Sequence, residues 1–195
     1  MSRPNRVLKR VLLLTAPQVV YIITPFMQTD LDRFDPWKLA AANGQLQGEI
    51  ALDHMPRLRS LLASPAGQVR IALEAGVDAQ AIVFLSGQLE TTVTLVCQRC
   101  LAPLKLPLTV PVRLGLVRSE RQAESLPEQY DPVLVPVEGV TIAELAEDEL
   151  ILVLPLVPMH SDSRQCQANG FVSPQAEAQK AQPFAALATL MNDLK

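Results

Sequence analysis

Two neighbouring segments in which apolar and polar residues alternate constrain the fold of this chain more than any other feature. In Leu89–Cys97 and again in Leu104–Leu116, every second position is apolar or threonine, and the positions between are mostly polar residues or proline. A period of two residues is typical of a strand with one buried face. Because few residues separate the two segments, we expect an antiparallel hairpin whose turn contains Cys97 and Cys100.

The second strand of this hairpin carries two prolines in the same phase. Pro107 and Pro111 lack backbone N–H groups, and both lie on the polar side of the alternation. Proline inside a sheet is found mainly on edge strands or at bends, because it cannot donate to a neighbouring strand. The segment is therefore predicted to be an edge or bent strand.

Shorter patterns predict the other elements of the fold. We expect strands at 45–52, 69–73 and 82–85, a surface loop at 118–132, and helices after Asp53, from Ile142 to about Val153, and from Pro183. Asp53 is the expected N-cap of the first helix, and Thr141 with Glu144 matches a capping box at the second. Since strands precede most helices, the sequence predicts an α+β fold: a mainly antiparallel sheet with a C-x-x-C hairpin turn, packed by a few short helices.

The chain changes character at both ends. The first ten residues contain four basic side chains and no acid, and an apolar run interrupted by two prolines follows up to Met27. This imitates a secretory signal, but it lacks a cleavage site and an uninterrupted membrane span, so a disordered or misassigned start is favoured over a signal peptide or membrane anchor. The expected organisation is an extension at 1–26, an α+β domain at 27–160, a flexible loop at 161–182 and an amphipathic helix at 183–195.

Composition limits the classes of function to consider. Of 195 residues 49% are hydrophobic, which supports a buried core and excludes wholesale disorder. The net charge is −3, and the chain after its first ten residues carries −7, so no global basic patch is expected. With one Trp, two Tyr and five Phe, an aromatic-lined platform for single-stranded nucleic acid is not expected either.

Cysteine spacing gives the strongest chemical motif. Cys97 and Cys100 form a C-x-x-C pair in the predicted turn, the arrangement of a zinc knuckle, and His160 with Cys166 completes a candidate Cys3His set. Structural zinc is the cofactor that this set suggests. Two other interpretations are open: a redox pair, although such pairs normally precede a helix rather than a strand, and reduced cysteines packed at a strand end.

One acidic residue of the predicted helix at 142–153 falls among apolar residues. At about 100° per residue, Glu149 lies at about 340°, between Leu145 at about 300° and Val153 at about 20°. A buried carboxylate requires a partner, and Arg99 in the cysteine turn is a candidate. In the alternative interpretation, the acidic run at 147–149 is a solvated face.

No arrangement typical of an enzyme is evident in the sequence. We find no Ser-His-Asp set, no phosphate-binding Gly loop and no H-E-x-x-H helix. The two histidines of the chain leave little scope for acid–base catalysis. The sequence therefore predicts a protein that is not an enzyme.

Several motifs occur together in a fixed order. They are Val93–Leu104 with C-Q-R-C-L-A-P, Glu147–His160 ending in P-L-V-P-M-H, Cys166, and Pro183–Leu187. In combination they resemble the bacterial YceD family of large ribosomal RNA subunit accumulation proteins, which has chloroplast relatives, from about residue 30 to the end of the chain. The resemblance implies a cytoplasmic, non-enzymatic factor required for 23S rRNA accumulation and large ribosomal subunit biogenesis. By position, Cys97, Arg99, Cys100, Glu149, His160 and Cys166 match the family signature.

Two kinds of partner are open for such a factor. Precursor ribosomal RNA would be contacted through Arg99 and Lys105, whereas a basic large-subunit ribosomal protein would be contacted through Glu147 and Asp148. The candidate interaction residues are thus Arg99, Lys105, Glu147, Asp148 and Glu149. The alternatives are a zinc-stabilised structural or interaction module, and a thiol redox protein that uses Cys97 and Cys100.

Overall fold

The structure, a computed structural model, describes residues 20–23 and 33–172. The chain divides into two compact units. The first contains the residues up to Leu95 together with Lys105–Leu156, and the second contains Val96–Leu104 together with the residues from Val157 onward. The three cysteines and His160 all belong to the second unit, whereas the acidic run at 147–149 belongs to the first.

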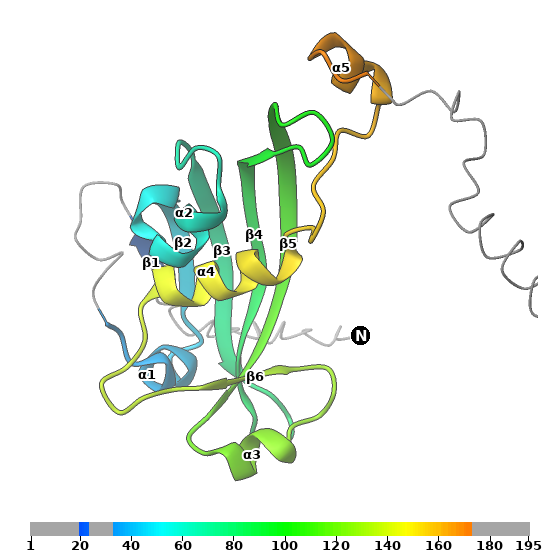
Figure 1. Cartoon of the computed structure of the whole chain (residues 1–195). Coiled ribbons are helices and arrows are strands. Elements are labelled where there is room, and N and C mark those ends of the chain that lie inside the picture. Colours follow the sequence, from blue (N-terminus) through cyan, green and yellow to red (C-terminus); the bar gives the residue numbers. More distant parts are fainter. Residues whose placement is uncertain (1–19, 24–32, 173–195) are drawn as a thin grey trace, which may run out of the picture. The chain divides into compact units, whose positions relative to one another are not determined.

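The first unit is built on a six-stranded sheet whose strands are arranged in chain order (Figure 1). They are β1 (Val20–Ile23), β2 (Gln45–Ala51), β3 (Gln68–Val77), β4 (Val83–Val96), β5 (Pro103–Val117) and β6 (Asp131–Leu134). The β2–β3 and β3–β4 pairs are antiparallel, whereas β1 and β6 run parallel to β2 and β5. This mixed, mostly antiparallel sheet with several short helices confirms the predicted α+β class.

Alternation along the strands buries one face of the sheet. In β3, Ile71 and Leu73 are buried and Ala72 between them is exposed, and the register places Ile71 opposite the buried Leu89 of β4. Helices α4 (Ile142–Val153) and α2 (Pro56–Leu61) lie over the sheet (Figure 1), and Leu58 and Leu150 join the same apolar core. A slip of one residue would turn every apolar side chain of a strand away from these helices, so burial fixes the register.

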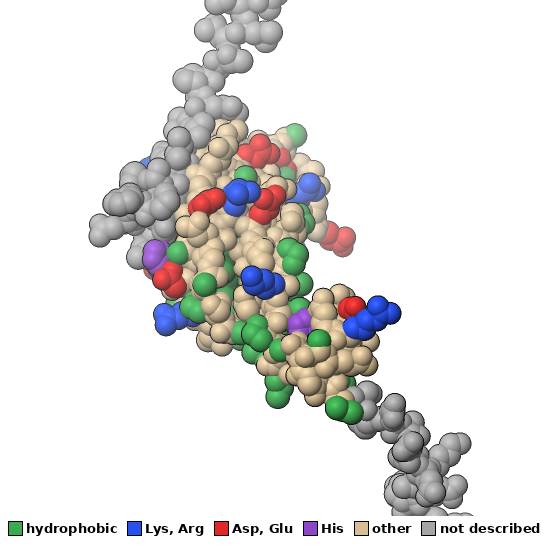
Figure 2. Space-filling model, turned by 90° about the horizontal axis from the view of Figure 1, so that it is seen from above, with side chains coloured by type: hydrophobic (Ala, Val, Ile, Leu, Met, Phe, Trp, Pro, Cys, Tyr) green, Lys and Arg blue, Asp and Glu red, His purple; other side chains and the backbone are tan. Residues whose placement is uncertain are grey.

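The exposed positions of the strands carry charges of both signs. Arg70 of β3 lies 3.5 Å from the Glu49 carboxylate of β2 and 3.2 Å from the Glu90 carboxylate of β4. Figure 2 shows acidic and basic side chains interspersed among the described residues in view. Cross-strand pairs of this exposed kind contribute little to stability, but they keep the surface polar.

Strand β5 is covered on its outer side only near its end. Strand β6 pairs with Leu114–Val117, and over the preceding residues, which include Pro107 and Pro111, no further strand is paired on that side in the described part of the chain. The two prolines therefore occupy an edge, as their missing N–H groups predict.

Helix starts agree with the sequence in one case and differ in another. Helix α4 begins with the predicted capping box, in which Thr141 Oγ1 accepts from Glu144 N at 3.0 Å and a Glu144 carboxylate oxygen accepts from Thr141 N at 2.9 Å. Asp53 is not the cap of α2: it lies in the short 3-10 helix η2 (Leu52–His54), and the N-cap of α2 is Met55, which has no side-chain acceptor. Because η2 follows β2, the N-cap position of α2 falls at Met55, two residues after Asp53.

Short helices also occur where loops were expected. Helix α3 (Glu120–Glu124), capped by Ser119, lies within the predicted loop at 118–132, and helix α5 (Ser163–Ala168), capped by Asp162, lies within the predicted loop at 161–182. Helix α1 (Pro36–Ala41) is capped by Asp35. A side-chain acceptor at the N-cap satisfies the free N–H groups of a short helix, and each of these three has one.

Parts of the predicted organisation lie outside the described residues. They include most of the extension at 1–26 and the whole helix predicted at 183–195. Strand β1, however, belongs to the sheet although its residues fall in the segment that the sequence assigned to an extension. Within the described residues, no helix combines the length and the apolar character needed to span a membrane.

The turn between β3 and β4 is held by one carboxylate. Asp78 Oδ1 accepts from the backbone N–H groups of Gln80 at 2.8 Å and Ile82 at 2.9 Å, and Asp78 Oδ2 accepts from the Tyr130 hydroxyl at 3.0 Å. The backbone N–H of Ile82, together with the Tyr130 hydroxyl and the backbone N–H of Gln80, lowers the pKa of Asp78 against the opposing effect of its burial. The ionised carboxylate therefore ties this turn to the loop that contains Tyr130.

We expect the stabilising effect of Asp78 to depend on pH. Because its pKa is lower in the folded state, its contribution is fully present above the unfolded pKa of about 3.9 and is lost as the pH falls through the folded value. Asp78→Asn should therefore lower the Tm at pH 7, and its difference from the natural protein should shrink at pH 3. Glu128→Gln, which alters an exposed carboxyl group, is the control and should change the Tm little at either pH. A Tm difference for Asp78→Asn that stayed constant with pH would contradict this role.

Candidate functional site

Cys97 and Cys100 lie in the tight connection between β4 and β5. Cys97 N donates to Ala102 O at 2.9 Å, and Leu101 N donates to Cys97 O at 2.8 Å. Leu101 has a φ of 59°, in the left-handed region that closes such a turn. The backbone folds into a knuckle that directs both thiols to one point.

The other two candidate ligands come from the segment after α4. Gln98 N donates to Pro158 O at 2.8 Å, which holds the extended segment before His160 against the cysteine knuckle. The carboxylate of Asp162 then accepts from Arg164 N at 2.8 Å and caps α5, the helix that carries Cys166. The extended segment that contains Pro158 thus positions His160, and the capped helix α5 positions Cys166.

These four side chains form one compact cluster with near-tetrahedral spacing. The ligand atoms of Cys97, Cys100, His160 and Cys166 all lie within 4.8 Å of one another. The Cys97 and Cys166 sulfurs are 3.8 Å apart, and His160 Nδ1 lies 3.5 Å from the Cys100 sulfur and 3.6 Å from the Cys166 sulfur. A tetrahedral zinc with bonds of about 2.3 Å to sulfur and about 2.05 Å to nitrogen requires about 3.8 Å between sulfurs and about 3.6 Å between sulfur and nitrogen. These three distances match a tetrahedral ion, and the four side chains are close enough together to hold one metal ion.

His160 is oriented by a contact on the far side of its ring. Its Nε2 lies 3.2 Å from Pro103 O, an atom that can only accept, so Nε2 carries the proton. The Nδ1 lone pair is then free to face the sulfurs of Cys100 and Cys166. A backbone carbonyl that fixes the tautomer in this way is a common support for metal-binding histidines.

Two further side chains donate toward the sulfurs. Arg99 Nη1 lies 3.9 Å from the Cys166 sulfur, and Asn169 Nδ2 lies 3.8 Å from the Cys100 sulfur. Arg99 Nη2 also lies 3.7 Å from Met159 Sδ. Three thiolates around a divalent ion would carry one net negative charge, which these two donors would face. Spacing alone would not have revealed Asn169, which has no counterpart in a cysteine motif.

The local environment separates the pKa values of the two buried thiols. Burial raises the pKa of Cys97, but backbone N–H groups of His160, Cys100 and Arg99 and the Cys100 side chain outweigh it and lower the value to about 5. Burial and the neighbouring sulfurs of Cys100 and Cys97 raise the pKa of Cys166 to about 11. Backbone N–H groups aimed at Cys97 favour the thiolate, the form that binds metals.

The acidic run on α4 is arranged differently from the sequence pattern. Glu147, not Glu149, is the buried residue, with an exposure of 3%. Its Oε1 accepts from the backbone N–H groups of Arg57 at 2.6 Å and Leu58 at 2.9 Å, and its Oε2 accepts from Arg57 Nε at 2.9 Å. Glu147 thus supplies the cap that α2 lacks. The sequence contains one signal for this contact. Met55 precedes a helix that begins at a proline, and its side chain offers no acceptor for the first N–H groups, so another residue has to supply one.

The remaining interaction candidates have less specific surroundings. Glu149 is half-buried, and burial together with Asp131 and Asp148 raises its pKa. Arg99, the partner that the helix pattern suggested for Glu149, contacts the sulfur atoms of Cys166 and Met159 within its own unit. Asp148 is exposed and pairs with Arg57 at 2.6 Å, and Lys105 is exposed on β5.

Together these features define an α+β protein that carries a buried cluster of three cysteines and one histidine able to hold a metal ion. The model of the family described as large ribosomal RNA subunit accumulation protein YceD matches residues 85–191. A Haemophilus influenzae protein of the same description is 36% identical over 162 residues, which cover 80% of this chain and 92% of the relative. No solved structure matches the chain. The chain belongs to the YceD family.

Replacement of the buried carboxylate should destabilise the first unit. Glu147→Gln keeps the size of the side chain but loses the charge that faces Arg57 and two backbone N–H groups, and we expect it to lower the free energy of unfolding by about 1–3 kcal/mol. Asp148→Asn is the matched control, because it alters an exposed carboxylate that pairs with the same arginine, and it should cost about 0–1 kcal/mol. Urea unfolding measures both. Equal losses in the free energy of unfolding for the two variants would show that Glu147 contributes no more than an exposed ion pair.

Proposed function

We propose that this protein is a non-enzymatic factor required for accumulation of 23S rRNA in large ribosomal subunit biogenesis, and that a structural zinc ion organises its second unit as a contact module. The proposal rests on family membership for the process and on the spacing of the four ligand atoms for the metal. A closed set of three sulfurs and one nitrogen leaves no open position, which is the pattern of structural rather than catalytic zinc.

Burial in the second unit supports a structural metal. Within its described residues, 96–104 and 157–172, the buried side chains are Cys97, His160 and Cys166, which are three of the four candidate ligands. A unit of this kind has no apolar core of its own there. Small modules without a core are commonly held together by a metal ion, which supplies folding free energy when it binds.

The redox interpretation fits the surroundings less well. A thiol with a lowered pKa can attack a disulfide, but the attack requires access to the sulfur, and Cys97 is fully buried. The C-x-x-C pair is also followed by strand β5 and not by a helix whose dipole would activate a cysteine. The metal interpretation needs no exposure of the sulfurs.

The exposed surface of the knuckle favours a protein partner. Leu101 is 74% exposed at the tip of the turn, and Val157, Met159 and Val172 are also exposed. The described residues of this unit contain two arginines and one aspartate, which is too little positive charge for affinity that depends on phosphate contacts. We propose a large-subunit ribosomal protein as the direct partner of the knuckle, with precursor rRNA as the alternative outcome, contacted through Arg99 and Lys105.

Metal analysis tests the zinc site. Protein purified without chelator should contain about one zinc per chain, and Cys97→Ser and His160→Asn should each lose it. The chain has a second histidine outside the cluster, so His54→Asn is a matched control that should retain the metal. Chelation should lower the Tm of the natural protein. Folded, reduced protein that contains no zinc would overturn the metal assignment and leave the cysteines as packed thiols.

Affinity purification tests the partner. The tagged protein should recover large-subunit ribosomal proteins, identified by mass spectrometry, and recovery should persist after nuclease treatment. Leu101→Ser should reduce recovery several-fold because it removes apolar surface from the knuckle. Leu152→Ser alters a leucine of α4 that is 78% exposed, and it should leave recovery unchanged. Loss of recovery on nuclease treatment would overturn the protein contact in favour of RNA, and failure to recover any large-subunit component would overturn both.

A further inference from the structure

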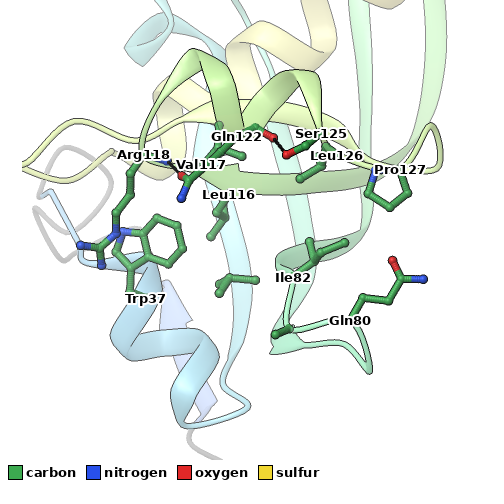
Figure 3. A pocket seen from close by; sticks show the side chains of 12 residues that line it. Trp37, Gln80, Ile82, Leu116, Val117, Arg118, Gln122, Ser125, Leu126 and Pro127 are labelled. Atoms are coloured by element: carbon green, nitrogen blue, oxygen red, sulfur yellow. Dashed lines mark hydrogen bonds between the residues drawn. The ribbon is translucent and has the colours of Figure 1, made fainter.

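We propose that a cavity beside Trp37 and Arg118 in the first unit binds a nucleotide, taking the base by stacking and the phosphate by charge. The cavity has a volume of about 380 Å³ and is formed by residues of α1, the β3–β4 turn, the end of β5 and the segment around α3 (Figure 3). This volume falls within the usual range for small-molecule sites. The proposal concerns a site separate from the cysteine cluster and does not require the metal.

A stacked aromatic and guanidinium pair forms one side of the cavity. The Arg118 guanidinium carbon lies 4.5 Å from the centroid of the Trp37 ring, and Figure 3 shows the two side chains together at one side of the opening. Proteins commonly hold single nucleobases against aromatic rings or arginine planes. This pair offers one such plane, and the low aromatic content that argues against a multi-base platform does not argue against a single site.

The other walls suit a flat base with polar edges. Ile82, Leu116 and Leu126 supply apolar surface, and the side-chain amides of Gln80 and Gln122 supply donors and acceptors. Gln122 is fixed on one side, because its Oε1 accepts from Arg118 N at 2.7 Å. Its amide nitrogen remains available to donate a hydrogen bond to the edge of a base bound in the cavity.

Positive charge at the opening suits a phosphate. The Arg118 guanidinium is exposed, and within the described residues it faces no carboxylate in an ion pair. A second cavity of about 560 Å³ shares Trp37 and Arg118 and adds Lys38 and Arg33. Lys38 makes a surface pair with Asp35 at 3.7 Å, and Arg33 is paired with Glu144 at 3.0 Å. Arg118 is therefore the principal phosphate contact, with Lys38 in support.

One wall of the cavity is already ordered. Asp78 fixes the backbone of Gln80 and Ile82 and is itself held by Tyr130, and between them Ala81 adopts a φ of 61°. Three consecutive lining residues thus belong to a turn whose shape a carboxylate determines. A preformed wall reduces the entropy cost of binding.

The base and phosphate can come from free nucleotide or from single-stranded RNA. The proposal concerns the base and phosphate that both sources share, and only the RNA source rests on the function proposed above. Because Trp37 is the sole tryptophan of the chain, its fluorescence reports on ligand binding beside the Trp37–Arg118 pair. The probes are adenosine and uridine 5′-monophosphates and the single-stranded tetranucleotides of adenylate and of uridylate, added to full-length protein with free tryptophan amide as the optical control.

We expect saturable quenching of Trp37 by at least one probe. Arg118→Gln should weaken binding about tenfold, whereas Arg121→Gln, which alters a neighbouring arginine that does not line the cavity, should not change it. Calorimetry on the same variants gives a readout independent of the tryptophan. Zinc content is measured for each variant, so that failure of the metal site and failure of this site are distinguished.

Each outcome decides the proposal. Binding by a tetranucleotide much tighter than by its monophosphate would assign the site to RNA, and equal affinities would assign it to free nucleotide. Absence of saturable quenching and of heat with all four probes would overturn the site. Binding that Arg118→Gln leaves unchanged would also overturn it, because the nucleotide would then lie elsewhere.

Discussion

The buried carboxylate of Glu147 connects the parts of the first unit that have least stability of their own. Helix α2 is six residues long, begins at a proline and has no acceptor at its N-cap, so it is not stable by itself. Glu147 reaches it from α4 and accepts from two of its first N–H groups, and Arg57 of α2 donates to the same carboxylate. The interaction sets the position of α2 beside α4, and with it Leu58 enters the core beneath. A charge in this place is costly unless every lone pair has a partner, and here the partners are present.

The second unit depends on a different kind of interaction. The first unit buries an apolar face of its sheet, whereas the described part of the second unit buries thiols and an imidazole. Its elements are a turn, an extended segment and α5, and none of these forms a packed layer. The ligand geometry that suits a metal and the absence of apolar burial there are two observations with the same physical explanation: the ion would replace the core.

Sequence reasoning succeeded where a pattern is local and failed where a partner is distant. Some features depend on residues that are close together in the chain: the alternation in β4 and β5, the prolines of β5 and the capping box at Thr141. Each of these is present in the structure. The grouping of Cys97, Cys100, His160 and Cys166 was predicted from residue types and family resemblance, and the structure brings their ligand atoms together. The cap of α2 could not be predicted in the same way, because Glu147 lies 90 residues from Arg57 in the chain. The angular position of Glu149 also misled, since the buried stripe of α4 is centred nearer Ala146 and Leu150.

The charge balance of the chain constrains how both proposed sites would work. A protein of net charge −3 cannot gain affinity for RNA by displacing many counterions, so any contact with nucleic acid must be local and short-range. A single stacking pair with one free guanidinium is of that kind, and it would give modest affinity with a small dependence on salt. The proposed contact of the knuckle, which exposes Leu101 and carries little net charge, would likewise depend on surface fit rather than on electrostatic steering. Two such weak contacts would together give a reversible interaction, because neither alone would retain the protein once the other is lost.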